Sequence, residues 1–335
     1  MKIVFDRNIP FIAGPLASIA EAIPMAGTDI TPEVARDADA MIIRTRTRCD
    51  ASLLEGSSCR FIGTATIGTD HIDLPYCSSK RITVANAPGC NAPAVAQWVL
   101  AAINEYTDSR PLDSVTLGVI GAGNVGSLLI RWARGLGIKV LVNDPPLQQT
   151  APDAYTYSGL DDIARECDII TVHTPLTRTG SHPTYHLINS DFISGLERRP
   201  LILNAARGPV TDTHALIDGL RSGKISAVGI DCWEGEPDLD LNLLDMAMIA
   251  TPHIAGYSRQ GKIRASQMVL DALSRHLGLH TRLLADAPLT APVPDIITPE
   301  MIGYDISADT RSLKGSPSSF ESLRNSYILR EEPAY

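Results

Sequence analysis

Three polar residues in the second half of the chain have the types that oxidation of a hydroxy acid needs. They are Arg207 in LILNAARGPVTD, Glu236 in GIDCWEGEP and His253 in MIATPHIAGY, and each follows an apolar, strand-like run. Residues just beyond the carboxyl ends of parallel strands face the ligand crevice of an α/β sheet, so we expect the three side chains to meet there. A guanidinium can hold a carboxylate through two hydrogen bonds, and an imidazole can move a proton near neutral pH. The glutamate can orient the imidazole and favour its charged form.

A nucleotide-binding pattern precedes these residues and weighs against the alternative that they are three unrelated loop residues. Residues 115–120 (VTLGVI) predict a short strand, GAGNVG follows at 121–126, and SLLIRWARGLG predicts a helix. In this context the first glycine permits a tight turn, the second lets the backbone approach a pyrophosphate, and the third allows close packing of helix on strand. We expect the dinucleotide to contact this loop at Gly121, Gly123, Asn124, Val125 and Gly126.

The choice of dinucleotide is indicated by an acid at the end of the next strand. Residues 139–142 (KVLV) predict that strand, and Asp144 stands 23 positions after Gly121. A carboxylate there can accept hydrogen bonds from the ribose hydroxyls, and it would repel a 2′-phosphate. We therefore expect NAD rather than NADP.

Composition limits the class of protein. The 335 residues carry a net charge of −9, with 44% hydrophobic and 20% charged residues, which is typical of a globular protein of two domains. The acidic balance argues against a nucleic-acid partner. No apolar run is long enough to span a bilayer, the first residues lack a signal-peptide pattern, and we expect no membrane partner. The 6 cysteines form no CxxC pair, which favours reduced thiols in the cytoplasm and no metal site.

The order of apolar runs predicts how the chain is divided. Short strands are expected at residues 2–6, 40–45, 60–66 and 82–85, long helices at 92–106 and 258–277, and a short helix at 320–330. From residue 115 strands and helices alternate, which predicts a doubly wound parallel sheet of the Rossmann type. We expect a flavodoxin-like α/β substrate domain at 1–92, the nucleotide-binding domain at 93–257, a crossover helix at 258–284 and a short dimerisation tail at 285–335. The tail has too few apolar residues for a core of its own, so it should pack on a second subunit of a homodimer.

The order of the motifs resembles the D-isomer-specific 2-hydroxyacid dehydrogenases. GTATIGTDHID at 63–73, APGCNAPAV at 87–95, NDPP at 143–146, HTPL at 173–176, TPHIAGYSRQGK at 251–262 and the tail segment SFESLRNSYILRE at 319–331 are similar to one branch of that family. The resemblance implies oxidation of 4-phospho-D-erythronate at C2, a step of vitamin B6 biosynthesis. The tail is shorter than is usual in that branch, which leaves the dimer geometry open.

Roles for individual residues follow from the resemblance. His253 would take the hydroxyl proton, Arg207 would bind the C1 carboxylate, and Glu236 would orient His253. Further contacts with NAD are implied for Thr174, Ala205, Asp231 and Gly256, and contacts with the substrate for Thr45, Thr66 and Tyr257. Thr174 and Asp231 could instead cap strand ends, and His71, Gln97 and His173 are given no catalytic role.

The phosphate of such a substrate needs a local positive site in an acidic protein. The segment IIRTRTR at 42–48 offers one, because Arg44, Arg46 and Arg48 would share a face if the strand continued through them. We expect Arg44 to bind substrate, whereas Arg46 and Arg48 could equally belong to a solvated edge.

Two alternatives stay open. The same scaffold could process 3-phosphoglycerate, or glyoxylate and hydroxypyruvate. More remotely, it could serve as an NAD-sensing corepressor that binds partners without turnover.

Overall fold

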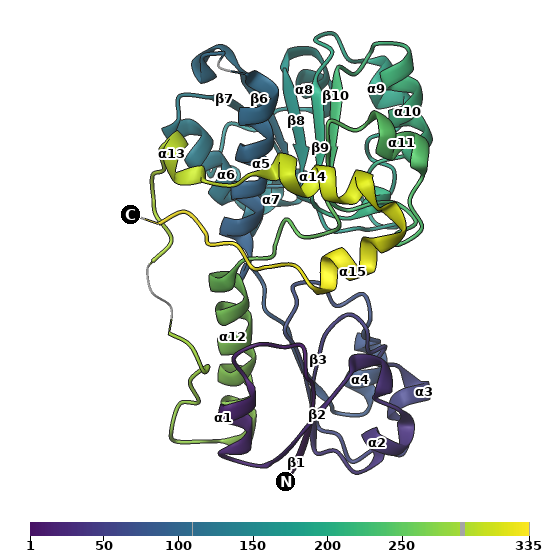
Figure 1. Ribbon diagram of the computed structural model, residues 1–335, viewed down its shortest axis with the longest axis vertical. Coiled ribbons are helices and arrows are strands. Elements are labelled where there is room, and N and C mark those ends of the chain that lie inside the picture. Colours follow the sequence, from purple (N-terminus) through teal and green to yellow (C-terminus); the bar gives the residue numbers. More distant parts are fainter. Residues whose placement is uncertain (109, 289–291, 335) are drawn as a thin grey trace. The chain divides into compact units, whose positions relative to one another are not determined.

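The computed structural model of the chain describes residues 1–108, 110–288 and 292–334, and the chain forms two compact units. The first comprises Met1–Asn91 with Ser258–Pro292, and the second comprises Ala92–Tyr257 with Val293–Tyr335. Each unit is built around one parallel sheet with helices on both faces (Figure 1). The expected α/β class with two parallel sheets is therefore confirmed.

The sheet of the first unit has the order β2-β1-β3-β4-β5. This is the flavodoxin-like order, in which the second strand lies at the edge. The strands are β1 (Lys2–Asp6), β2 (Glu21–Met25), β3 (Ala40–Ile43), β4 (Phe61–Thr64) and β5 (Thr83–Ala85). The helices are α1 (Ala13–Ala17), η1 (Gly27–Asp29), α2 (Pro32–Arg36), α3 (Ala51–Leu54), α4 (Leu74–Ser79) and α12 (Arg259–Leu277).

The long helix α12 covers one face of this sheet, opposite α2, α3 and α4 (Figure 1). Its Val269 lies so close to Gly63 of β4 that a Cβ on Gly63 would stand 2.6 Å from a Val269 methyl carbon. Ser258 begins the helix by accepting a hydrogen bond from the amide of Gly261 at 3.0 Å, and Gly278 ends it in the left-handed conformation. The expected helix at 258–277 is thus confirmed to within one residue.

The sheet of the second unit has the order β11-β10-β9-β8-β6-β7. Its central strands are buried on both faces, which explains their continuous apolar sequences. The strands are β6 (Thr116–Ile120), β7 (Lys139–Asn143), β8 (Ile169–Val172), β9 (Leu201–Asn204), β10 (Ala227–Ile230) and β11 (Ile249–Ala250). The helices are α5 (Ala92–Thr107), η2 (Leu112–Ser114), α6 (Asn124–Gly135), α7 (Pro145–Thr150), α8 (Leu160–Glu166), α9 (Ser190–Ser194), η3 (Gly208–Val210), α10 (Thr213–Arg221) and α11 (Leu241–Met246).

The connection order of this sheet reverses at β6. Its neighbour on one side is β7, and its neighbour on the other side is β8. Such a reversal opens a crevice at the carboxyl ends of the strands, where α/β proteins bind ligands. The glycine pattern follows β6 directly, so the fold places it at that point.

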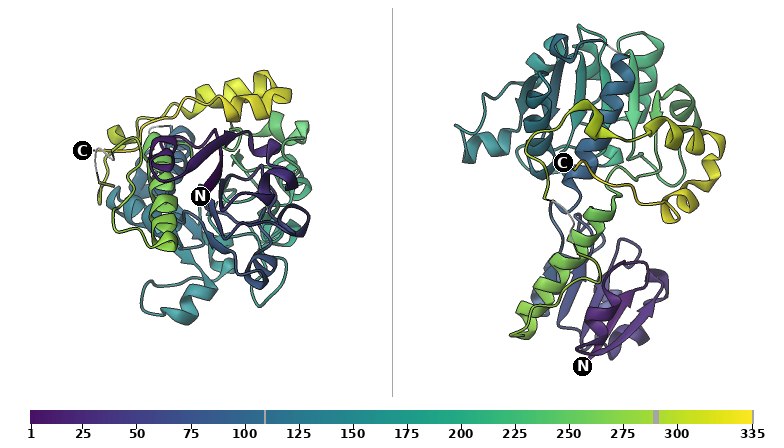
Figure 2. Two further views of the ribbon diagram at one scale, coloured as in Figure 1. Left: turned by 90° about the horizontal axis from the view of Figure 1, so that it is seen from below. Right: turned by 60° about the vertical axis from the view of Figure 1, so that its left-hand side comes forward.

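The C-terminal tail packs against the second unit of its own chain (Figures 1 and 2). It contains α13 (Pro299–Ile302), α14 (Ile306–Gly315), η4 (Pro317–Ser319) and α15 (Phe320–Asn325). Ile302 and Ile306 join the core around α5 and α6, and Leu313 and Phe320 join the core on the other side of the sheet. Only the last of these helices was predicted from the sequence, at 320–330. Docking on a second subunit stays a prediction.

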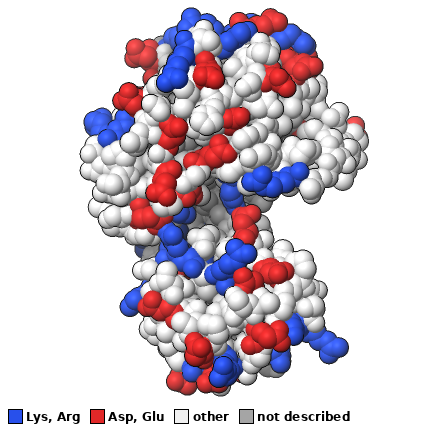
Figure 3. Space-filling view, turned by 90° about the vertical axis from the view of Figure 1, so that its right-hand side faces the viewer, with Lys and Arg blue, Asp and Glu red and all other residues white. Residues whose placement is uncertain are grey.

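None of the helices that the structure describes combines the length and the apolar character that crossing a membrane requires. Charged side chains of both signs are mixed over the face drawn in Figure 3. On this face an anionic ligand would have to be held by particular residues, and not by a broad basic surface.

Candidate active site

The glycine loop after β6 has the geometry that a dinucleotide needs. Gly121 adopts a φ of 94°, and a Cβ on Gly126 would collide with the carbonyl of Gly121. A Cβ on Gly123 would meet nothing within 4 Å, and Gly123 begins α6 without a side-chain capping bond. The amides at the start of α6 therefore border open space, where the helix dipole favours an anion. Asn124 and Val125 form the first turn of this helix.

Asp144 lies beside the same loop. Its Oδ2 accepts a hydrogen bond from the amide of Ala122 at 2.8 Å, and its Oδ1 caps α7 by accepting from the amide of Leu147 at 2.9 Å. The carboxylate is thus fixed next to the glycine turn, as the expected ribose contact requires. The sequence did not predict that Asp144 also caps a helix.

The other residues expected at the cofactor stand at the ends of successive strands. Thr174 follows β8, and its Oγ1 is buried without a hydrogen-bond partner among the described residues. Ala205 follows β9, Asp231 follows β10, and Gly256 lies in the turn after His253. An open helix N-terminus and an unpartnered buried hydroxyl both suit a bound dinucleotide. No group of three His, Cys, Asp or Glu side chains within the described ranges could hold a metal ion.

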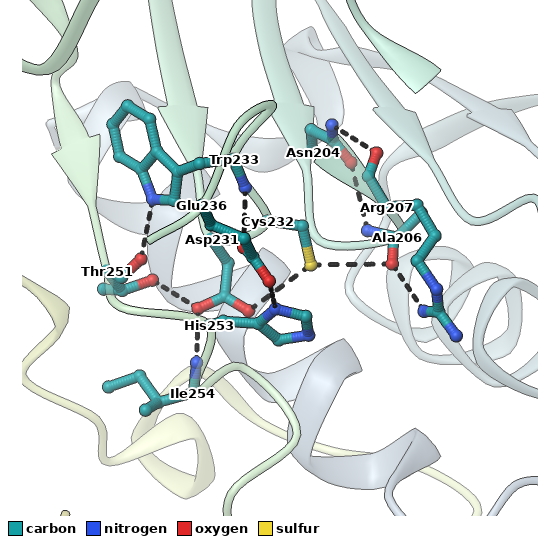
Figure 4. Close-up of polar contacts among 10 residues, drawn as sticks. All are labelled: Asn204, Ala206, Arg207, Asp231, Cys232, Trp233, Glu236, Thr251, His253 and Ile254. Carbon is teal, nitrogen blue, oxygen red and sulfur yellow. Dashed lines mark hydrogen bonds and ion pairs between the residues drawn. The ribbon is translucent and has the colours of Figure 1, made fainter. Parts of the chain in front are cut away.

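His253 and Glu236 form a direct pair (Figure 4). The Nδ1 of His253 lies 2.6 Å from the Oε1 of Glu236, and about a quarter of each side chain is exposed (26% and 25%). The other oxygen of Glu236 accepts a hydrogen bond from the amide of Trp233 at 3.1 Å. Glu234, the first glutamate of the WEGEP motif, instead contacts His186 Nε2 at 2.6 Å. Glu236 is therefore the partner of His253.

The surroundings keep Glu236 ionised. Burial acts to raise its pKa, but the hydrogen bond and the charge of His253, the amide of Trp233 and the charge of Arg324 outweigh burial, so the pKa lies below the usual value. A carboxylate on Nδ1 holds the proton of a neutral imidazole on that nitrogen. The Nε2 of His253 is then left to accept a proton.

The backbone around His253 is held by Asp231 (Figure 4). His253 has a φ of 56°, which a non-glycine residue adopts only where its surroundings enforce it. Asp231 is buried, and its Oδ1 accepts hydrogen bonds from the amide of Ile254 at 2.7 Å and the hydroxyl of Thr251 at 2.6 Å. Trp98 of α5 donates to the same hydroxyl at 3.0 Å. Burial raises the pKa of Asp231, although His253 and these hydrogen bonds oppose it.

Arg207 is placed by the loop after β9. The buried Asn204 donates to the carbonyl of Arg207 at 3.0 Å and accepts from the amide of Ala206 at 3.1 Å. A Cβ on Gly208 would collide with the carbonyl of Trp233, so this loop packs directly on the segment that carries Glu236. The Nη1 of Arg207 donates to the carbonyl of Ala206 at 2.8 Å. Arg207 therefore lies at the same end of the sheet as the His253–Glu236 pair, as Figure 4 shows, and its guanidinium contacts the carbonyl of Ala206.

The expected row of three arginines in the first unit is wrong. Strand β3 ends at Ile43, and the chain then turns so that the amide of Thr47 donates to the carbonyl of Arg44 at 3.1 Å. Arg44 pairs with the buried Asp6 at 2.9 Å, and Arg48 pairs with Asp50 at 2.8 Å. The side chains cannot alternate as in a strand, because the extended backbone stops before the first arginine.

The two threonines expected at the substrate differ in setting. Thr45 lies exposed in the turn after β3. Thr66 follows β4, where its hydroxyl lies 2.6 Å from that of Thr64 and donates to the carbonyl of Gly68 at 3.1 Å. The Nε2 of His71 lies 3.2 Å from the same Thr64 hydroxyl. His71 thus contributes to the shape of this loop.

A residue of the tail that was not predicted from the sequence reaches the Glu236 region. Arg324 of α15 is hydrogen bonded to the side chain of Tyr257, the expected substrate contact of the second unit. Burial acts to lower the pKa of Arg324, but Tyr257 and the negative charge of Glu236 outweigh it and raise the pKa. Arg324 lies within the tail segment SFESLRNSYILRE at 319–331, but only the docking of α15 shows what it contacts.

Comparison with known proteins agrees with this geometry. The family described as "D-isomer specific 2-hydroxyacid dehydrogenase, NAD binding domain" matches residues 93–255, so the second unit binds NAD. An erythronate-4-phosphate dehydrogenase of Bacteroides fragilis is 46% identical over 347 residues, which span 100% of this chain and 98% of that protein. The enzyme of the same name from Porphyromonas gingivalis is 40% identical over 98% of this chain and 92% of its own length.

Solved structures of similar fold come from the same class of dehydrogenase. A D-lactate dehydrogenase of Aquifex aeolicus, complexed with NAD and lactic acid, has a TM-score of 0.69 and 27% identity, and the match covers 82% of this chain and 96% of that one. An NAD-bound 3-phosphoglycerate dehydrogenase of Entamoeba histolytica has a TM-score of 0.70 at 24% identity over 86% and 99% of the two chains, which supports the fold alone. The chain therefore belongs to the D-isomer-specific 2-hydroxyacid dehydrogenases, in the branch of the erythronate-4-phosphate dehydrogenases.

Proposed function

We propose that this protein oxidises 4-phospho-D-erythronate at C2 to (R)-3-hydroxy-2-oxo-4-phosphooxybutanoate with NAD, in the biosynthesis of vitamin B6. The observation that carries the proposal is the His253–Glu236 pair at 2.6 Å, which lies next to the Arg207 loop at the strand ends. It stands in a chain that is 46% identical, over its whole length, to an erythronate-4-phosphate dehydrogenase.

His253 is proposed as the general base. Its Nδ1 is held by the ionised Glu236, so its Nε2 can take the proton of the C2 hydroxyl. Glu236 then stabilises the charged imidazole, because the opposite charge lies within hydrogen-bond distance. NAD, when bound, supplies the hydride acceptor.

Arg207 is proposed to bind the C1 carboxylate and to polarise the C2 oxygen. A guanidinium matches a carboxylate through two parallel hydrogen bonds, and it stabilises negative charge that develops on the oxygen. The buried Asn204 supports this role, because its side chain donates a hydrogen bond to the backbone of the loop that carries Arg207. The arginine is thereby pre-positioned and needs little reorganisation when substrate binds.

The remaining substrate contacts are proposed for Thr45, Thr66 and Tyr257, whose hydroxyls suit carboxylate or phosphate oxygens. Arg44 also remains a proposed contact, but its pairing with Asp6 means that one side of its guanidinium is already engaged. The phosphate preference is therefore expected to depend on Thr45 more than on Arg44.

For the cofactor contacts, we propose that Asp144 binds the adenosine ribose and that the amides around Gly123 hold the pyrophosphate. Thr174, Ala205, Asp231 and Gly256 are proposed to line the rest of the cofactor. The unpartnered hydroxyl of Thr174 and the open start of α6 support this arrangement.

The test compares 4-phosphoerythronate with unphosphorylated erythronate, 3-phosphoglycerate, glycerate and glycolate, each with NAD and with NADP. We expect strong preference for 4-phosphoerythronate with NAD, and a smaller preference for the phosphate in the variants Thr45→Ala and Arg44→Ala. His253→Ala should lower kcat by about 10²–10⁴-fold while NAD still binds, since a general base contributes about that much. Equal use of erythronate and its phosphate by the wild type would leave only a general 2-hydroxyacid dehydrogenase.

The assembly proposed is a cytoplasmic homodimer that uses the C-terminal tail. Ile328 of the tail is 88% exposed, and a cavity of about 470 Å³ opens beside it, lined in part by Tyr304 and Tyr327. An exposed branched side chain beside a hollow is a feature that a partner surface would cover.

A further inference from the structure

One arginine of the tail makes an unusually complete set of hydrogen bonds. The guanidinium of Arg330 has five N–H donors, and all of them are used. Nε donates to Oε1 of Gln97 at 3.1 Å, and Nη1 donates to the carbonyls of Ile254 at 2.9 Å and Tyr257 at 3.1 Å. Nη2 donates to the carbonyl of Ala94 at 2.9 Å and to that of Ala255.

Three of these acceptors belong to the turn that directly follows His253. The turn closes with a hydrogen bond from the amide of Tyr257 to the carbonyl of Ile254 at 2.8 Å. It contains Gly256, a proposed contact of NAD, and it ends at Tyr257, a proposed contact of the substrate. Arg330 therefore fixes the turn that carries Gly256 and Tyr257 and that directly follows His253.

The opposite side of the same segment is held by a carboxylate. Asp231 accepts the amide of Ile254 at 2.7 Å, and its backbone carbonyl accepts the amide of His253 at 2.9 Å. The peptide groups that follow His253 thus lie between the Asp231 carboxyl group on their N–H side and the Arg330 guanidinium on their C=O side. Such an arrangement can hold His253 at a φ of 56° that it would not adopt alone.

Neighbouring residues of the tail and of α5 hold the Arg330 side chain in place. Its guanidinium lies over the ring of Tyr304 at 4.4 Å, and Tyr304 donates to Asp309 of α14 at 2.6 Å. The buried Gln97 of α5 fastens the surrounding backbone, because its amide nitrogen donates to the carbonyls of Ile302 at 2.7 Å and Glu331 at 3.2 Å. A glutamate at position 97 could not donate these two bonds.

We propose that Arg330 is a positioning residue for catalysis, which couples the C-terminal tail to the turn that aligns His253, Gly256 and Tyr257. This inference rests on the proposed function. It predicts that loss of the guanidinium misaligns the catalytic base and leaves the glycine loop intact. A misplacement of about 1 Å can lower turnover by roughly 10²-fold, so we expect a fall in kcat of about 10–100-fold.

The kinetic test uses the full-length variants Arg330→Ala and Arg330→Lys, with Arg311→Ala as the matched control. Arg311 is in the same tail, its side chain is 71% exposed, and its ion pair with Asp305 is 3.8 Å long. The kcat of Arg330→Ala should be lower than that of the wild type, and millimolar guanidinium chloride should restore part of it. Arg330→Lys should recover less than half of the wild-type activity, because an ammonium offers three donors in place of five. Arg311→Ala should behave as wild type.

A second readout does not depend on which substrate the enzyme uses. Hydrogen exchange in the peptide that covers residues 253–258 should become faster in Arg330→Ala and stay unchanged in Arg311→Ala. If wild type fails to oxidise 4-phosphoerythronate, the proposed function is wrong, and kcat is then compared on whichever 2-hydroxy acid wild type oxidises. Wild-type kcat in Arg330→Ala would overturn the positioning role, and so would a loss of kcat without faster exchange in this peptide.

Discussion

At the scale of single residues, the chemistry of the site depends on the pairing of one imidazole with one carboxylate. The 2.6 Å contact between His253 and Glu236 engages Nδ1 of the ring and leaves Nε2 as the proposed base, and the lowered pKa of Glu236 keeps the carboxylate charged. The ionised carboxylate can therefore stabilise the positive charge that the imidazole gains when it takes a proton during reaction.

This pairing predicts the effect of Glu236→Gln on turnover. The amide keeps the size of the side chain and removes the charge, so kcat should fall by about 10–100-fold, because the charged imidazole loses its stabilising partner. The rate of NAD reduction at saturating substrate measures the effect. Wild-type kcat in Glu236→Gln would show that the carboxylate does not assist the base.

Cofactor choice is predicted to depend on Asp144. Asp144→Ser should raise the KM for NAD by about 10–100-fold, because a hydrogen bond to a charged group usually contributes about that much to binding. It should also reduce the preference of the enzyme for NAD over NADP. Because Asp144 also caps α7 through the amide of Leu147 at 2.9 Å, Asp144→Asn serves as the control that keeps the cap. Steady-state kinetics with NAD and with NADP measure both the KM for NAD and the cofactor preference. Efficient use of NADP by the wild type would contradict this role.

The site residues that could be predicted from the sequence lie at strand ends, and the residues that could not be predicted lie elsewhere. Arg207, Glu236 and His253 were selected because each lies in the loop that follows a strand, and strand ends converge in a parallel sheet. Arg330 lies 77 positions after His253 in the sequence, and its acceptors are backbone carbonyls, which carry no sequence signal. Only the docking of the tail creates this contact.

At the scale of elements, the loop that carries Arg207 packs closely on the segment that carries Glu236. The loop after β9 can approach the loop after β10 only because Gly208 has no side chain, since a Cβ would collide with the carbonyl of Trp233. The motif NAARG therefore needs its glycine for packing, whereas its arginine is the proposed ligand contact.

Gly208→Ala should lower both stability and turnover. Overpacking of a filled site costs about 1–3 kcal/mol, and the collision pushes the Arg207 loop away from the segment that carries Glu236. Thermal unfolding and kcat should be measured together, with Gly315→Ala as the control, because a Cβ on Gly315 would meet nothing within 4 Å. A variant with wild-type turnover would mean that the contact between the loops does not set the geometry of the site.

The elements that could not be predicted from the sequence have physical reasons. Strand β2 contains Pro24, which argues against a central strand, but β2 lies at the edge of its sheet, where a missing N–H is tolerated. Helices α13 and α14 are short, and their apolar residues find partners only on the second unit. The end of β3 at Ile43 is likewise decided by a turn and not by strand propensity.

At the scale of the whole molecule, the tail contributes to the hydrophobic cores of its own chain, independently of any dimer. Ile302, Ile306, Leu313 and Phe320 are buried in the two cores of the NAD-binding unit. Deleting residues 288–335 would therefore expose both cores, and the resulting monomer or aggregate would not reveal how the tail contributes to assembly. A test of the dimer has to leave these four side chains in place.

A single exposed side chain of the tail meets this requirement. We expect the wild type to be a C2 homodimer by light scattering at micromolar concentration, since twofold dimers are the commonest closed assembly. Ile328→Asp should shift it toward monomer with little change in thermal unfolding, because Ile328 is 88% exposed and a buried charge at an interface is costly. Leu241→Asp is the control, since Leu241 is 62% exposed on α11, outside the tail. A monomeric wild type would rule out the dimer, and a dimer that tolerates the Ile328→Asp substitution would place the interface on another surface.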